Sequence, residues 1–186
     1  IEEKHLGGIC LNWGCIPTKA ILKSAELYQS IQKAKEFGLS VQELNFDLKE
    51  IINRSKKIAS RLSLGVKHLL KKNNVTVYSG TASLESSTSI LIRQDGNEQI
   101  INVDKIVIAT GARPRDLPLI KSDGKLIWNY KHALRPSRMP SKLLVIGSGA
   151  IGVEFASFYN ALGADTTLIE ALETILPQED DEISKL

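Results

Sequence analysis

The sequence predicts an α/β fold, and three patterns along the chain lead to that prediction. Apolar residues recur at helical spacing in two long segments of the first half, and an alternation of period two follows in short segments. Further on, a strand, a glycine-rich turn, a helix and a second strand follow one another. We therefore expect an α/β chain with a parallel sheet and a small β meander.

The composition is that of a globular protein and excludes several classes of function. Of the 186 residues, 42% are hydrophobic and 24% charged, which supplies enough apolar material for a core and excludes a disordered chain. The net charge of +3 is too near balance to favour a nucleic acid or an anionic membrane as a partner. No apolar run has the roughly 18 residues that a membrane span needs. Two cysteines are too few for a secreted disulfide framework, which favours a reducing compartment.

Two helices are expected in the first half of the chain. The first begins near Pro17, because proline suits a first helical turn, and ends at Gly38. The second covers residues 47–72 and has an apolar stripe along one face, with lysines and arginines on the rest. These basic residues could form a nucleic-acid patch, but no aromatic residues are interleaved with them, which favours a solvated helix face.

Three short strands and one buried strand are expected next. The short strands cover residues 75–80, 89–94 and 99–103, with turns at residues 86–87 and 95–96. Residues 105–112 form a continuous apolar run that ends in glycine, as a buried parallel strand does. Four prolines follow between residues 114 and 140. We place a domain boundary there, which gives a partial domain 1–115, a linker 116–140 and the first part of a second domain, 141–186.

Cys10 and Cys15 form the most specific chemical signal. Zinc needs four ligands, and only three histidines and no second cysteine pair accompany these thiols, so no metal site is predicted. On spacing alone, two unrelated buried thiols remain an alternative. The surrounding glycines favour a tight, exposed loop, and Cys15 precedes a helix N-terminus, which lowers the pKa of a thiol, as does the nearby Lys19. These surroundings favour a reactive dithiol.

A glycine-rich turn carries the second signal. It reads Gly147-Ser148-Gly149-Ala150-Ile151-Gly152, and Glu170 closes the next strand 21 residues after Gly149. Such glycines permit a tight turn, the approach of a pyrophosphate and close packing of helix on strand, while the acid binds ribose hydroxyls. A plain βαβ unit is the alternative, but the position of the acid favours a dinucleotide site. An acid in place of a basic residue favours NAD over NADP.

Glu154 lies two residues beyond the last of these glycines, on an otherwise apolar helix. By its pattern alone, a solvent-facing helix residue is the better interpretation of this side chain.

Together these motifs resemble those of the flavin-dependent pyridine nucleotide–disulfide oxidoreductases. The matching stretches are GGICLNWGCIPTK (7–19), ATGARP (109–114), VIGSGAIGVEFA (145–156) and ILPQEDDEIS (175–184). The first stretch is most similar to the branch that oxidises dihydrolipoamide. The resemblance implies FAD/NAD(P)-binding Rossmann-like domains, FAD and NAD as cofactors, and oxidation of a protein-bound dihydrolipoyl group by NAD⁺.

The resemblance also implies roles for individual residues. Cys10 is the interchange thiol and Cys15 the charge-transfer thiol beside the flavin, where Lys19 pairs with Glu154. Ile9 stands where the family more often has threonine, which removes a side-chain bond to the flavin phosphate. The implied cofactor-binding residues are Glu2, Gly8, Ile9, Cys10, Lys19, Ala82, Thr110 and Gly111 for FAD, and Gly147, Gly149, Ala150, Ile151, Gly152, Glu154 and Glu170 around the nucleotide motif.

Two features of the family are absent from this sequence. The first glycine-rich loop would precede Glu2, and an acid–base histidine would come from a C-terminal domain, so we expect an internal piece of a longer enzyme, incomplete at both ends. The implied partners are a lipoyl domain of a 2-oxo acid dehydrogenase complex and a second subunit in a homodimer. The implied location is the cytoplasm, or alternatively the mitochondrial matrix. An NADPH-dependent disulfide or metal-ion reductase and a non-catalytic fragment are the alternative functions.

Overall fold

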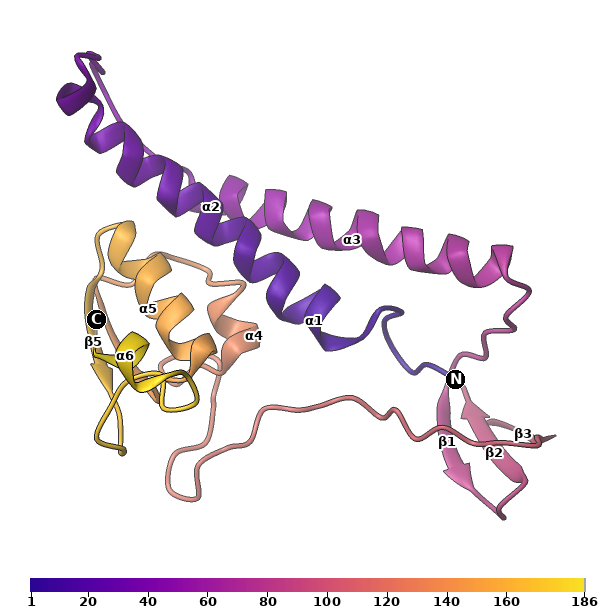
Figure 1. Cartoon of the computed structure of the whole chain (residues 1–186). Helices are drawn as coiled ribbons and strands as arrows, with labels where there is room; N and C mark the ends of the chain where they lie inside the picture. The colour runs from indigo at the N-terminus through magenta and orange to yellow at the C-terminus, as the bar shows by residue number, and fades with distance from the viewer. Residues whose placement is uncertain (186) are drawn as a thin grey trace. The chain divides into compact units, whose positions relative to one another are not determined.

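The structure is a computed structural model that describes residues 1–185, and the chain divides into two compact units (Figure 1). The meander unit consists of residues Ile1–Asn12 and Ala59–Arg113. The βαβ unit consists of residues Trp13–Ile58 and Pro114–Leu186. Two helices, α1 (Gly8–Trp13) and α3 (Leu48–Lys72), contribute residues to both units.

The meander unit contains an antiparallel sheet of order β1-β2-β3. Its strands are β1 (Thr81–Leu84), β2 (Ser89–Gln94) and β3 (Asn97–Asn102). Asp95 and Gly96 both have positive φ, 49° and 83°, as a two-residue type I′ hairpin requires, so the predicted turn is confirmed. The predicted strand at 75–80 is wrong: the first strand starts at Thr81, and only Ser79 forms an isolated parallel bridge, with Glu2.

Residues 105–112 form no strand, which contradicts the prediction of a buried parallel strand there. Val107 is 87% exposed and Ile108 72% exposed. A strand exists only where a neighbour accepts and donates its backbone hydrogen bonds, and no strand among residues 1–185 pairs with this segment. Its apolar pattern is therefore not enough by itself to form a strand.

The βαβ unit forms as the sequence predicts. Strands β4 (Lys142–Ile146) and β5 (Asp165–Ile169) pair in parallel, and helix α5 (Ala150–Ala161) connects them. Helix α2 (Cys15–Gln32) packs against α5. The core of the unit gathers buried apolar side chains from α2, α3 and α5, among them Ile21, Ala25, Ile52, Phe158 and Tyr159.

The helices of the first half differ from the prediction at their ends. Helix α1 occupies a stretch where a loop is expected. Helix α2 ends at Gln32 rather than Gly38, and a 3₁₀ turn, η1 (Ala34–Phe37), follows it before Gly38 adopts a left-handed conformation. Helix α3 matches its prediction, because the Asp47 carboxylate accepts the Glu50 N–H at 3.1 Å and fixes the start.

The proline-rich stretch contains structure of its own. Helix α4 (Tyr130–Ala133) is capped by Asn129, and Leu134 is buried in the core of the βαβ unit. A last helical turn, α6 (Asp181–Ser184), follows β5. No helix among residues 1–185 is both long enough and apolar enough to cross a lipid bilayer.

Candidate functional site

Cys10 and Cys15 occupy two consecutive helical segments, and both are exposed. Cys10 lies within α1, and Cys15 is the first residue of α2. The turn that leads into α1 depends on Asn12, whose side-chain amide donates to the Leu6 carbonyl at 2.9 Å and the Gly8 carbonyl at 2.8 Å. These bonds replace the expected open loop around Cys10 with a short helix. Nothing in the sequence pattern singles out Asn12 for this role.

The start of α2 brings positive charge close to Cys15. Gly14 is the N-cap and offers no side-chain acceptor, so the first N–H groups of the helix remain available to an anion. Lys19 lies one turn further along and forms an ion pair with Glu154 of α5. The Glu154 carboxylate raises the pKa of Lys19, and the negative charge of Cys15 adds to that rise. The predicted pairing of Lys19 with Glu154 is therefore present.

Only one member of this pair is shielded from water. The Lys19 side chain is 68% exposed, whereas that of Glu154 is 22% exposed. The long, exposed lysine side chain thus reaches a largely shielded carboxylate on another helix.

Contacts that the sequence did not predict hold the first turns of α2. Ser55 of α3 is buried and donates through Oγ to the Pro17 carbonyl at 3.0 Å, and Arg54 donates to the Ala20 carbonyl at 2.8 Å. The guanidinium of Arg135 lies 3.6 Å from the centre of the Trp13 ring, and the Lys131 ammonium lies 5.4 Å from it. Two cations therefore stack on the residue that stands between the two cysteines.

The glycine-rich turn has the geometry that a dinucleotide site needs. Gly147 has a φ of 100°, and Gly149 caps α5 without any side-chain hydrogen bond. A Cβ on Gly152 would lie 1.9 Å from the Gly147 carbonyl oxygen, so this position admits no side chain. The turn and the open N-terminus of α5 fit a bound pyrophosphate. A cavity of about 760 Å³ adjoins this turn and is lined also by Ala150 and Ile151.

The Glu170 carboxylate is hydrogen-bonded to the glycine-rich turn. One of its oxygens accepts from both the N–H and the hydroxyl of Ser148 at 2.7 Å, and the other accepts from the N–H groups of Ala171 and Leu172. The N–H of Ser148 and the other donors lower the pKa of Glu170 to about 2. The carboxylate is therefore charged at neutral pH. Ser148 is fully buried, and no pattern in the sequence points to its role.

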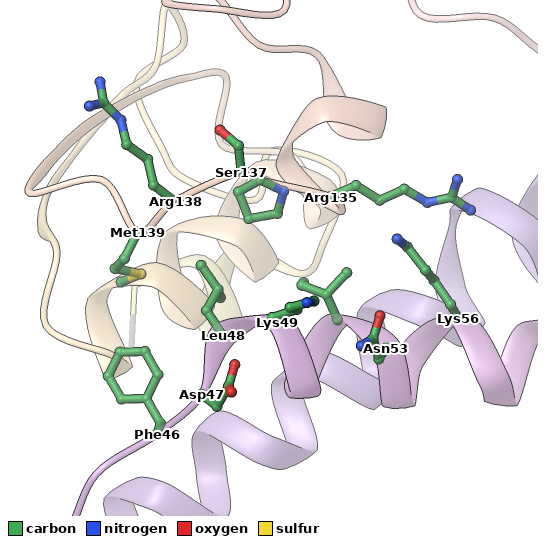
Figure 2. Close-up of a pocket in the computed structure, with 12 residues that line it drawn as sticks. Phe46, Asp47, Leu48, Lys49, Asn53, Lys56, Arg135, Ser137, Arg138 and Met139 are labelled. Atoms are coloured by element: carbon green, nitrogen blue, oxygen red, sulfur yellow. The ribbon is translucent and has the colours of Figure 1, made fainter.

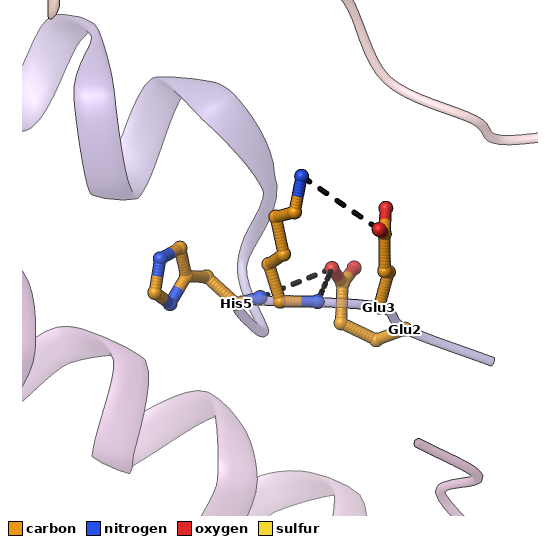
Figure 3. Close-up of polar contacts among 4 residues, drawn as sticks. Glu2, Glu3 and His5 are labelled. Carbon is orange, nitrogen blue, oxygen red and sulfur yellow. Dashed lines mark hydrogen bonds and ion pairs between the residues drawn. The ribbon is translucent and has the colours of Figure 1, made fainter. Parts of the chain in front are cut away.

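Glu2 has a similar but more local environment in the meander unit (Figure 3). Its carboxylate accepts the N–H groups of Lys4 at 2.9 Å and His5 at 3.0 Å, and the first of these lowers its pKa. Its backbone bonds to residues 78 and 80 on the neighbouring segment. An acid at the end of a strand-like segment fits a ribose, as Glu170 does after β5.

The other residues that the resemblance implies for FAD belong to three places: the surface of β1, an unpaired segment and the start of α1. Ala82 is exposed on β1, Thr110 and Gly111 lie in the unpaired segment, and Gly8 and Ile9 begin α1. Their roles stay predictions. Within residues 1–185, no three or more histidine, cysteine, aspartate or glutamate side chains are grouped to hold a metal ion.

Comparison with known proteins identifies the family. The pattern of the family described as Pyridine nucleotide-disulphide oxidoreductase matches residues 1–186. The dihydrolipoyl dehydrogenase of Zymomonas mobilis is 55% identical over 185 residues, which are 99% of this chain and 40% of that protein. That of Rhizobium etli is 44% identical over 202 residues, 100% of this chain and 42% of that protein. The chain thus spans about 40% of the length of these curated relatives.

Solved structures agree with the sequence relatives. LpdA from Mycobacterium tuberculosis matches with a TM-score of 0.90 and 28% identity, over 98% of this chain and 40% of that chain. The HOCl-induced flavoprotein disulfide reductase RclA from Escherichia coli matches with a TM-score of 0.77 and 28% identity, over 95% of this chain and 37% of that chain. These matches confirm the resemblance, and the chain belongs to the pyridine nucleotide-disulphide oxidoreductase family.

Proposed function

We propose that this chain is part of a flavin-dependent dithiol–disulfide oxidoreductase that oxidises a protein-bound dihydrolipoyl group with NAD⁺. The observation that carries the proposal is the 55% identity with a dihydrolipoyl dehydrogenase over 99% of the chain. The local chemistry agrees, because both thiols are exposed and Cys15 is the first residue of α2, whose N-terminus favours a thiolate.

Cys10 and Cys15 form the redox pair in this proposal. A substrate thiolate attacks the Cys10 sulfur of a Cys10–Cys15 disulfide, and Cys15 leaves as a thiolate. The second substrate thiol then displaces Cys10, so the substrate leaves as a cyclic disulfide and its two electrons remain on the protein thiols. One substrate proton stays on Cys10 and the other goes to solvent. The N-terminus of α2 and the charge of Lys19 stabilise the Cys15 thiolate.

FAD and NAD⁺, the cofactors of the family, supply the onward two-electron and hydride transfer when bound. Gly147, Gly149 and Gly152 shape the turn for the NAD pyrophosphate, and Glu170 binds the adenosine ribose. Because the Glu170 carboxylate is charged, it would repel a 2′-phosphate, which selects NAD over NADP.

A second set of residues holds FAD in the proposal. Glu2 binds the ribose of its adenosine, the backbone of Ala82 meets the adenine, and Thr110 and Gly111 lie beside the flavin. Gly8 and Ile9 contact FAD through their backbone, and the Lys19–Glu154 pair lies beside the flavin. The proposed domains remain 1–115 for FAD, 116–140 as the link, and 141–186 for NAD.

The whole protein would work with partners. We propose a lipoyl domain of a 2-oxo acid dehydrogenase complex as the carrier of the substrate, a homodimer as the assembly, and the cytoplasm as the location.

The test uses the full-length protein loaded with FAD. Dihydrolipoamide should reduce NAD⁺ much faster than NADP⁺, and both Cys10→Ser and Cys15→Ser should abolish this activity. In the reduced protein, Cys10→Ser should keep the long-wavelength thiolate–flavin absorbance and Cys15→Ser should lose it. The opposite spectra would reverse the two roles, and full activity in either variant would refute the proposal.

A further inference from the structure

A second cavity, of about 620 Å³, lies within the βαβ unit between the start of α3 and the segment that follows α4 (Figure 2). It shares no lining residue with the cavity at the glycine-rich turn. Its floor includes the apolar side chains of Phe46, Ile52 and Met139. The proposed redox and dinucleotide chemistry uses none of these residues.

The lining of this cavity carries an excess of positive charge. Lys49, Lys56, Arg135 and Arg138 line it, against a single acid, Asp47. None of these four cations forms an ion pair with an acid in the described part of the chain. The Asp47 carboxylate accepts a backbone N–H at the start of α3, where it offsets the helix dipole. Like charges gathered without a counterion favour the binding of an anion.

A contact with the Trp13 ring positions the Arg135 side chain, which suits the binding of such an anion. Its guanidinium stacks 3.6 Å from the centre of the Trp13 ring, and partial burial lowers its pKa. The arginine side chains that form hydrogen bonds within residues 1–185 are those of Arg54 and Arg93, so the N–H groups of Arg135 are available to an anion. Figure 2 shows the Lys56 side chain directed towards that of Arg135. The fixed fork of an arginine beside a lysine matches the oxygens of a phosphate.

We propose that this cavity binds a small phosphate monoester. The phosphate lies between Lys56 and Arg135, and the organic part rests on Ile52, which lies one helical turn before Lys56 on the same face of α3. A phosphate monoester carries close to two negative charges at neutral pH. It therefore neutralises the excess positive charge of the lining better than the single charge of a carboxylate does. The volume of the cavity leaves room for an organic group beyond the phosphate.

The first test measures binding to the full-length, FAD-loaded protein with saturating NAD⁺, so that nucleotide sites are already filled. Isothermal titration with phenyl phosphate, phenol and inorganic phosphate separates the two parts of the ligand. Phenyl phosphate should bind tightest, and its affinity should fall as salt is raised. Equal binding of phenol would overturn the role of the cations, and equal binding of inorganic phosphate would overturn the role of the apolar floor. Binding of the probe only when NAD⁺ is left out would place it in the dinucleotide cleft and refute the proposal.

The second test compares matched lysine variants on one helix. Lys56→Gln should weaken phenyl phosphate binding about tenfold, because one charged hydrogen bond to the phosphate is lost. Lys57→Gln, at the exposed next position outside the cavity, should leave the affinity unchanged. Arg135→Lys keeps the charge but removes the stacked fork and should weaken binding as well. Equal affinities of the Lys56→Gln and Lys57→Gln variants would overturn the proposal.

Discussion

Two acids of this chain, Glu170 and Glu2, end strand-like segments, yet the backbone around them is built differently. Glu170 is braced by Ser148, a residue 22 positions earlier that belongs to the glycine-rich turn. Within the described part of the chain, the Glu2 carboxylate accepts hydrogen bonds only from its near neighbours Lys4 and His5. The glycine-rich turn therefore supplies long-range donors that fix an acid in place, and the meander unit has no counterpart to it among the described residues.

The strands that carry the two acids differ in the same way. β5 pairs with β4 over its whole length, whereas the backbone at Glu2 makes a single bridge, to Ser79. The site around Glu170 is rigid because β4 and β5 are paired and α5 covers them. The residues that hydrogen-bond Glu170 are therefore themselves held in place. Four predictions test this contrast.

The largest effect is expected for Gly152→Ala in the βαβ unit. The added Cβ would lie 1.9 Å from the Gly147 carbonyl oxygen, so α5 must move away from β4. We expect a loss of about 3 kcal/mol in the free energy of unfolding and weaker NAD⁺ binding. Urea unfolding measures the first quantity. Gly149→Ala is the stability control, because nothing lies within 4 Å of its Cβ position. Equal destabilisation by both variants would contradict the described turn.

Gly80→Ala should have the next largest effect, in the meander unit. Gly80 has a φ of 132°, and a Cβ there would lie 2.4 Å from the Arg93 carbonyl oxygen on β2. We expect a loss of about 2 kcal/mol and faster amide exchange in β2. Gly65→Ala, within α3 and with open space around it, should instead stabilise by about 0.5–1 kcal/mol. A loss of similar size in both variants would mean that the contact with the Arg93 carbonyl is not the cause of the first result.

The same contrast explains which elements the sequence could predict. The strand at residues 89–94, the turn at Asp95–Gly96 and the β4–α5–β5 unit have their partners within the described chain, and they form as expected. Residues 75–78 and 105–112 have strand-like sequences but belong to no paired strand among residues 1–185, and they remain irregular. Apolar pattern therefore predicts the propensity for a strand, and pairing decides whether the strand forms.

The site was predictable only where a motif fixes the backbone. The glycine spacing anticipated the turn, and the family resemblance anticipated the Lys19–Glu154 pair. Ser148, Ser55 and the stack of Arg135 on Trp13 were missed, because each joins residues far apart in sequence through a single side chain. Such contacts leave no periodic signal.

Ser148→Ala should raise the pKa of Glu170 and leave the pKa of Glu2 unchanged. The hydroxyl of Ser148 donates to Glu170 at 2.7 Å, so its loss should raise the pKa of Glu170 from about 2 towards its ordinary value of 4.5. Carbon NMR of the side-chain carboxyl groups measures this, with Glu2 as the internal control. An unchanged midpoint for Glu170 would mean that the backbone donors alone set its pKa.

This variant also has a consequence for acid stability. A carboxyl whose pKa is lowered by folding stabilises the protein above the unfolded value of 4.5, and that contribution disappears as the pH falls towards 2. The Ser148→Ala protein should therefore lose less stability than the parent between these two pH values. A steeper acid loss in the variant would contradict the assignment.

The smallest effects are expected for two ion pairs, one in each unit. Lys19–Glu154 joins two helices and has one shielded partner, whereas both members of Arg93–Glu98 on neighbouring strands are more than half exposed. Double-mutant cycles with glutamine should give coupling energies of up to about 1 kcal/mol for the first pair and about 0.3 kcal/mol for the second.

The pH dependence and salt dependence of the first pair complete this prediction. Because Glu154 raises the pKa of Lys19 above 10.5, the contribution of the pair is fully present below pH 10.5 and is lost as the pH rises through the folded value. Since the lysine is 68% exposed, 1 M salt should remove most of the coupling. A coupling above about 2 kcal/mol that survives salt would require a buried lysine. Both members would then be shielded from water, and the contrast between this pair and Arg93–Glu98 would be far larger than their exposures imply.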